Sequence, residues 1–116
     1  MQPDQLIDRA HLDAQTFGDR ALARELLQLF DQQCVRLLPG IADGDLGAAA
    51  RADLAHTLKG SALGVGAARI AAASAAIEDG LRDGAPPAGI ALDGLARAVE
   101  ATRAEIGRIA AGGSVP

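Results

Sequence analysis

Apolar residues recur along most of this chain at steps of three and four, which is the spacing that gives an α-helix one apolar face. The clearest case lies between residues 90 and 110, where inward positions follow the seam of an antiparallel bundle: Leu92, Leu95, Val99, Thr102, Ile106 and Ile109. Similar runs predict a short leading helix and four longer ones, at about residues 6–15, 20–41, 46–63, 67–82 and 90–110.

Residues with special backbone preferences mark the expected ends of these helices. Asp8 and Asp19 stand where an N-cap is needed, since a short carboxylate accepts hydrogen bonds from the free amides of a first turn. Pro39 and Gly40 should kink or end the second helix, because proline lacks an N–H. Gly64 is the expected C-cap of the third helix, and residues 111–116 are expected to form a flexible tail.

Composition supports an all-α fold. Aromatic residues are 2 % of the chain, and the helix formers Ala, Leu and Arg are abundant while strand-favouring residues are few. The expected architecture is an antiparallel up-down four-helix bundle with a short extra N-terminal helix. We expect one domain over residues 1–116 and a freestanding, monomeric chain, since it begins with Met1 and four helices cover one core.

Net charge narrows the possible partners. The formal charge is −4 and the isoelectric point is about 5.0, so neither nucleic acid nor an anionic membrane is an expected partner. The longest apolar stretch, residues 70–77, is too short to span a bilayer. One cysteine, Cys34, cannot form an internal disulfide, which favours a cytoplasmic location. The alanine-rich composition leaves little room for a large cofactor pocket, so no bound cofactor is expected.

The third helix carries the most informative side chain. At about 100° per residue, its expected core residues fall within roughly 120°, namely Leu46, Ala50, Leu54, Thr57, Leu58 and Ser61. His56 lies roughly 150–160° from the middle of that arc. The helix geometry therefore predicts that His56 points into solvent.

The neighbours of His56 suggest that its exposure is functional. Lys59 is the only lysine in the chain, beside ten arginines, and it follows His56 by three residues. Gly60 costs roughly 1 kcal/mol in a helix interior but would leave the imidazole accessible. The expected docking surface around this histidine consists of small, acidic or exposed apolar residues, namely Val35, Ala49, Ala52, Asp53 and Leu63.

These residues resemble a known family. The string His56-Thr57-Leu58-Lys59-Gly60-Ser61-Ala62, followed by Gly64-Val65-Gly66-Ala67, is similar to the signature of histidine-containing phosphotransfer (HPt) domains. The segments Thr16 to Asp19 and Glu25 to Phe30 are also typical of that family, so the resemblance covers nearly the whole chain. It implies the same four-helix bundle.

The resemblance also implies a function. His56 would accept a phosphoryl group from a receiver-domain phospho-aspartate or a hybrid histidine kinase, and would pass it reversibly to another response-regulator receiver. Lys59 would lie beside the phosphoryl group, and Gly60 would admit the partner's loops. The chain would be a phosphoryl carrier without kinase activity, and the receiver would supply Mg²⁺.

Two further residues have supporting places in this scheme. Many family members hydrogen-bond the histidine through a glutamine or another polar residue on the next helix, and Glu78 is the nearest candidate here. A carboxylate could orient the imidazole but would also repel a phosphate. Ser61, within the motif, is expected on the core side of its helix as a supporting residue.

Two other functions compete with this interpretation. Asp8-x-x-His11 and Asp53-x-x-His56 have the acid-to-histidine spacing of metal-binding helical bundles, although such ligands must point inward. A non-catalytic helical adaptor that binds receiver domains is the second alternative, and the intact His56 and Lys59 weigh against it.

Overall fold

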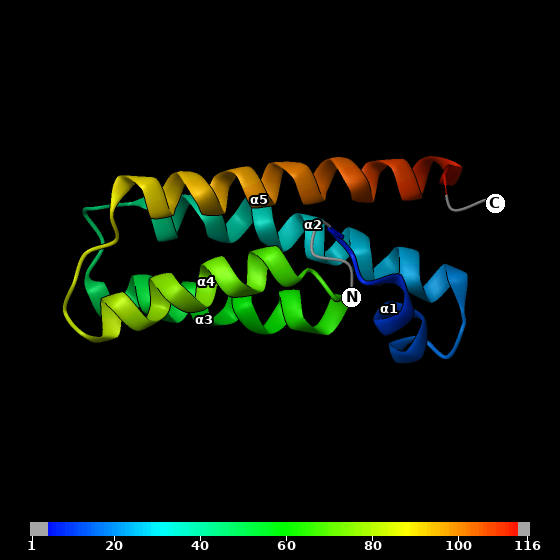
Figure 1. Cartoon of the computed structure of the whole chain (residues 1–116), viewed down its shortest axis with the longest axis horizontal. Coiled ribbons are helices and arrows are strands. Elements are labelled where there is room, and N and C mark those ends of the chain that lie inside the picture. The colour runs from blue at the N-terminus through cyan, green and yellow to red at the C-terminus, as the bar shows by residue number, and fades with distance from the viewer. Residues whose placement is uncertain (1–4, 114–116) are drawn as a thin grey trace.

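The computed structural model describes residues 5–113 and contains helices but no strands within that range. Four long helices lie side by side in a body of 45 × 24 × 22 Å, with a short helix at one end (Figure 1). In chain order the elements are α1 (Arg9–Gln15), α2 (Arg20–Ala42), α3 (Ala48–Val65), α4 (Ala68–Arg82), α5 (Gly89–Arg108) and a π-helical turn, η1 (Ile109–Gly113). The predicted all-α class is confirmed.

Both predicted N-caps are confirmed. The Asp8 side chain accepts a hydrogen bond from the amide of His11 at 3.0 Å, and that of Asp19 accepts one from Leu22 at 3.0 Å. Because Asp8 is the cap, α1 begins at Arg9 and is shorter than predicted. The amide of Asp8 also donates to the carbonyl of Gly66 at 2.9 Å, which fastens the N-terminal segment to the end of α3.

The second helix continues through Pro39 to Ala42, close to the predicted end at residue 41, so of the two outcomes expected at Pro39–Gly40, a kink or an end, the end is wrong. Leu37 and Ile41 are buried on either side of the proline and hold the last turn against the core. The buried guanidinium of Arg51 donates from Nε to the carbonyl of Ile41 at 2.9 Å. This bond satisfies an acceptor that the helix end would otherwise leave unpaired.

The predicted core face of α3 is only partly right: Leu58 is buried and Leu54 and Ser61 are half-buried, but the other three predicted residues are exposed. Ala50 and Thr57 are exposed and Leu46 is 38 % exposed, whereas the buried residues of the helix are Arg51, Ala52, Ala55, Leu58, Ala62 and Val65. Small alanines let α3 and α4 approach closely, so this face contributes to the core through contact rather than through side-chain bulk. Leucine is the more apolar residue, so the positions of the leucines predicted one face, whereas alanines form half of the buried one.

The end of α3 also differs from the prediction. The helix passes Gly64 and ends at Val65, with Gly66 as its C-cap at φ 80°. The amide of Ala67 donates to the carbonyl of Ala62 at 2.8 Å, which closes the turn into α4. A β-carbon on Gly66 would lie 3.0 Å from both the carbonyl oxygen and the β-carbon of Asp8, so this position favours glycine twice over.

The C-terminal end is partly helical. Of the predicted tail, residues 111–113 belong to η1 and residues 114–116 lie outside the described range, so the flexibility of this segment stays a prediction. Ile109, the first residue of this turn, is buried against the other helices and so helps to hold it in place.

The two glycines at the end of α3 should respond oppositely to alanine. Gly64→Ala fills open space in a helical turn and should raise the free energy of unfolding by about 0.5 kcal/mol. Gly66→Ala should lower it by more than about 1 kcal/mol, because alanine is strained at positive φ and would crowd Asp8. Urea unfolding of both variants checks this, and equal effects would contradict the assigned C-cap.

Candidate functional site

His56 lies on the exposed side of α3, as predicted, with 63 % of its side chain accessible. Gly60, one turn further along α3, is also exposed, and a β-carbon there would meet no atom within 4 Å. The imidazole therefore stands beside open surface. Tight α3–α4 packing brings a second helix up to one side of it.

The neighbour that α4 contributes is Glu78, a carboxylate in a residue only 7 % exposed. Its oxygens lie 3.1 and 3.2 Å from Nδ1 of His56. Lys59 donates from Nζ to the same carboxylate at 3.0 Å, and Arg82 donates to it at 3.3 Å. One nearly buried anion thus receives three donors from two helices. Glu78 was the predicted neighbour of His56, and the structure places it there.

The cationic partners keep Glu78 ionised. The hydrogen bond from Lys59, helped by His56, lowers the pKa of this carboxyl below its ordinary value of 4.5, against the opposing effect of burial. Lys59 is itself only 28 % exposed, so it is held against Glu78 and is not extended into solvent.

The Glu78 contact also assigns the tautomer of His56. An ionised carboxylate can only accept hydrogen bonds, so Nδ1 must carry the proton that joins the ring to Glu78. In the neutral imidazole the other nitrogen, Nε2, then holds the free lone pair. The arrangement can therefore present an oriented nitrogen nucleophile at the surface.

Arg82 is a member of this cluster that the sequence analysis missed. It donates to Asp53 at 2.9 Å as well as to Glu78, so it joins α3 to α4 beside His56. The hydrogen bond from Arg82 to Asp53, and then the one to Glu78, raise the pKa of this guanidinium above its ordinary value. The four-residue spacing from Glu78 to Arg82 on one helix was the available signal.

The predicted docking residues divide into exposed and buried ones. Val35 and Leu63 are 53 % and 57 % exposed, and Ala49 and Asp53 are also exposed. Ala52 is fully buried at 0 %, so its predicted place on the partner surface is wrong. It faces the core because the buried face of α3 is rich in alanines, and the predicted core face did not include these residues.

A groove between α2 and α3 continues this surface. It has a volume of about 590 Å³, and its lining includes Leu29, Phe30, Ser61 and Gly64. Ser61 is half-buried there and lies about 140° around α3 from His56, so it belongs to the groove and not to the imidazole's contacts. Leu29, 57 % exposed, is an apolar docking candidate that the sequence analysis missed.

The metal alternative gains no support from the side-chain positions. No group of three or more His, Cys, Asp or Glu side chains within residues 5–113 is placed to hold a metal ion. Asp8 caps α1, and Asp53 pairs with Arg82. Over the same described part of the chain, no helix is long and apolar enough to cross a membrane.

Fold and site together define a class: an all-helical module that presents an oriented histidine, flanked by a cation, on an accessible helix face. The chain matches the Hpt domain family over residues 20–105 and belongs to it. Members of this family are histidine phosphotransfer modules of phosphorelay systems. No curated protein and no solved structure matches the chain.

The Glu78 cluster should make stability depend on acid pH. A carboxyl whose pKa is lowered by folding stabilises the protein above its unfolded pKa, and this contribution disappears as pH falls through the folded value. Glu78→Gln lacks it, so the stability advantage of the wild type should shrink as pH falls below 4.5. Urea unfolding from pH 7 to pH 3 measures the difference.

Asp79→Asn is the matched control, since Asp79 is the next residue of α4 and is exposed. Its difference from the wild type should change much less over the same pH range. A Glu78→Gln difference that stays constant with pH would contradict the ion cluster.

Proposed function

We propose that this chain is a phosphorelay intermediate that accepts a phosphoryl group on Nε2 of His56 and passes it on to a receiver domain. The observation that carries the proposal is the Nδ1 contact to Glu78 at 3.1 Å beside an exposed ring. In the neutral ring this contact assigns the proton to Nδ1, so the lone pair of Nε2 would be the one that a phosphoryl group meets. The donor would be a receiver phospho-aspartate or a hybrid histidine kinase, and the recipient another response-regulator receiver.

The transfer step balances without any proton leaving this chain. The lone pair of Nε2 forms a bond to phosphorus as the bond from phosphorus to the aspartyl oxygen breaks, and the aspartate departs as a carboxylate. The ring, still protonated on Nδ1, becomes a phosphorylated imidazolium. Glu78 offsets that new positive charge at hydrogen-bond distance, which is a reason for a carboxylate at this position. The reverse step follows the same path.

Lys59 and Arg82 would reduce the electrostatic repulsion between Glu78 and the phosphoryl group. Glu78 repels an incoming phosphoryl group, but the two cations already contact it at 3.0 and 3.3 Å. Lys59 can turn from Glu78 toward the phosphoryl oxygens while Arg82 continues to neutralise Glu78. The ammonium of Lys59 would then stabilise the negative charge on the oxygens of the phosphoryl group during transfer. The partner receiver would supply Mg²⁺.

The surface around His56 suits a transient protein partner. Gly60 and Gly64 follow His56 at one and two turns of α3. Because neither glycine has a side chain, the helix surface between the imidazole and the groove with α2 is free of protruding groups at these two positions. Exposed Val35 and Leu63 would add apolar contact. The proposal includes a monomeric, cytoplasmic protein and the up-down antiparallel order of α2 to α5 that the family resemblance implies.

Replacing the phosphoacceptor tests the function directly. His56→Gln should abolish labelling by a phosphorylated receiver, because no imidazole nitrogen remains, while circular dichroism stays helical. Labelling is followed by gel with radioactive phosphate. Wild-type-like labelling of His56→Gln would overturn the site, and receiver binding without labelling of the wild type would favour the adaptor function.

Lys59→Ala is the companion variant in that assay, since it keeps the imidazole and removes only the ammonium. It should still accept phosphate, but about tenfold to a hundredfold more slowly, and its phosphohistidine should be shorter-lived. An unchanged rate and lifetime would remove Lys59 from the mechanism.

A bulky residue beside the imidazole should block docking. Gly60→Leu should weaken receiver binding at least about tenfold, because the side chain would occupy open surface one turn from His56. Gly94→Leu is the matched control, since Gly94 is also an exposed helical glycine with open space, but on α5. Calorimetric titration measures both, and equal affinities would contradict the docking face.

A further inference from the structure

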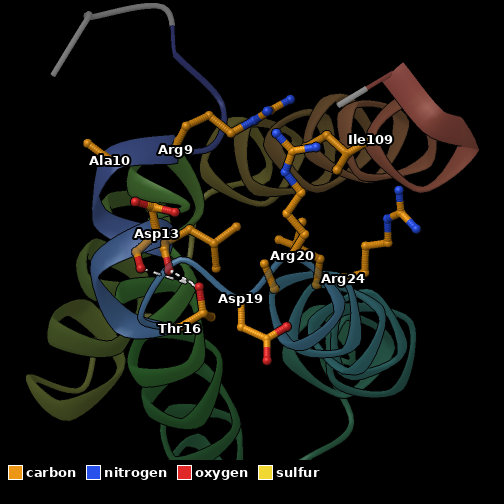
Figure 2. Close-up of a pocket in the computed structure, with 11 residues that line it drawn as sticks. Arg9, Ala10, Asp13, Thr16, Asp19, Arg20, Arg24 and Ile109 are labelled. Atoms are coloured by element: carbon orange, nitrogen blue, oxygen red, sulfur yellow. Dashed lines mark hydrogen bonds between the residues drawn. The ribbon is translucent and has the colours of Figure 1, made fainter. Parts of the chain in front are cut away.

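A second recess lies at the end of the molecule that carries α1. It has a volume of about 380 Å³ and is bounded by α1, the start of α2 and Ile109 at the end of α5. Leu12, Leu27 and Ile109 form an apolar floor, each no more than 6 % exposed. Arg9, Arg20 and Arg24, all exposed, stand around it. We call this recess the arginine pocket (Figure 2).

Two of the three arginines lack an anionic partner within the described residues. Within residues 5–113, neither Arg20 nor Arg24 has an ion pair within 4.0 Å, and Arg9 reaches only Glu105, at 3.8 Å. Arg82, Arg103 and Arg108, by contrast, each donate to a carboxylate at 3.0 Å or less, whereas Arg36, Arg69 and Arg97 also have no ion pair in this range but do not gather at one recess. In a chain of net charge −4, three cations directed at one recess are therefore a local excess.

Their positions also conflict with helix electrostatics. Arg20 is the first residue of α2 and Arg24 lies one turn later. A cation is unfavourable near the positive end of a helix dipole, and like charges four residues apart repel each other. Local rules are most often broken where function requires it. Here the two unfavourable placements coincide with the walls of a recess.

Two acidic residues line the same recess and offset part of its positive charge. The Asp19 carboxylate is already used as the N-cap of α2, and Figure 2 shows it pointing away from the end where Arg9 and Arg20 approach Ile109. Asp13 lies on the α1 side. Because Arg9 is paired with Glu105, the unpaired positive charge at the recess is that of Arg20 and Arg24, neither of which contacts a carboxylate within residues 5–113.

We propose that the arginine pocket binds an acidic peptide segment of a partner protein, with one apolar side chain as its anchor. The guanidinium forks suit carboxylates, and the apolar floor suits a leucine-sized group. An apolar centre within a charged rim is the anatomy of a protein interface. Small-molecule sites instead use polar groups set into the pocket wall, and the buried hydroxyl of Thr16 is already donating to the carbonyl of Leu12 at 2.9 Å.

This site is separate from the phosphotransfer site. No residue that lines the arginine pocket belongs to the His56 cluster or to the groove between α2 and α3. An acidic segment bound there would hold a partner to the chain without covering the imidazole. The proposal therefore stands whether or not His56 accepts phosphate.

The test uses the full chain, labelled with ¹⁵N, and the synthetic peptide Ac-Glu-Leu-Glu-Glu-Leu-Glu-NH₂ as probe. Amide shifts should be confined to α1, the first turns of α2 and the end of α5, and binding should weaken as salt rises. Comparison probes are the same peptide with lysine for glutamate, the same peptide with alanine for leucine, and acetate. Each should bind at least about tenfold more weakly.

Arg20→Gln and Arg24→Gln should each weaken peptide binding at least about fivefold, and Arg97→Gln, an exposed arginine on α5 outside the pocket, should not. Because these changes relieve repulsion, both pocket variants should melt at or above the wild-type temperature, so loss of binding cannot arise from unfolding. Equal binding of the lysine peptide, shifts elsewhere on the molecule, acetate binding as strong as the peptide's, or no saturation by millimolar peptide would overturn the proposal.

Discussion

The site depends on one ion cluster, the Glu78 carboxylate beneath three donors at the α3–α4 interface. Without its partners, a carboxylate so nearly buried would lose more from desolvation than it could recover. With them, it remains ionised and in turn holds Nδ1 of His56 at 3.1 Å and Nζ of Lys59 at 3.0 Å. Glu78 thus orients the imidazole of His56, the proposed nucleophile. It also holds the ammonium of Lys59 close to the place where the transfer would need a positive charge. The close packing of α3 on α4 makes this geometry possible, and the buried face of α3 includes the small residues Ala52, Ala55 and Ala62.

A carboxylate at this position changes the balance of charges in the site. An amide would orient the imidazole without offsetting its charge, whereas Glu78 would offset the imidazolium that the proposed N-phosphorylation creates. The accompanying cost is repulsion of the phosphoryl group, and Arg82 provides the compensation by binding both Glu78 and Asp53. Glu78, Lys59 and Arg82 therefore act as a unit, and the effects of changing them singly should not add.

Charge is distributed unevenly over the molecule. Around His56 the cations are matched by Glu78 and Asp53, so that surface presents one exposed imidazole among small and apolar residues. At the α1 end, Arg20 and Arg24 are unmatched within the described residues and surround an apolar floor. The first arrangement would suit the transient contact with a receiver domain that the proposed phosphoryl transfer requires. The second suits electrostatic capture of an acidic segment, which a chain of net charge −4 would otherwise repel.

The sequence by itself determined the helical class, the caps at Asp8 and Asp19, the exposure of His56 and the family, because each rests on local preference, helical period or a short motif. It misplaced the core face of α3 and the cap at Gly66, since alanine contacts and the position of Asp8 depend on neighbouring helices. Arg82 escaped notice for the same reason, because its importance comes from a partner 29 residues away. Only the tertiary structure decided which nitrogen of His56 is hydrogen-bonded, because the carboxylate that contacts Nδ1 comes from a different helix.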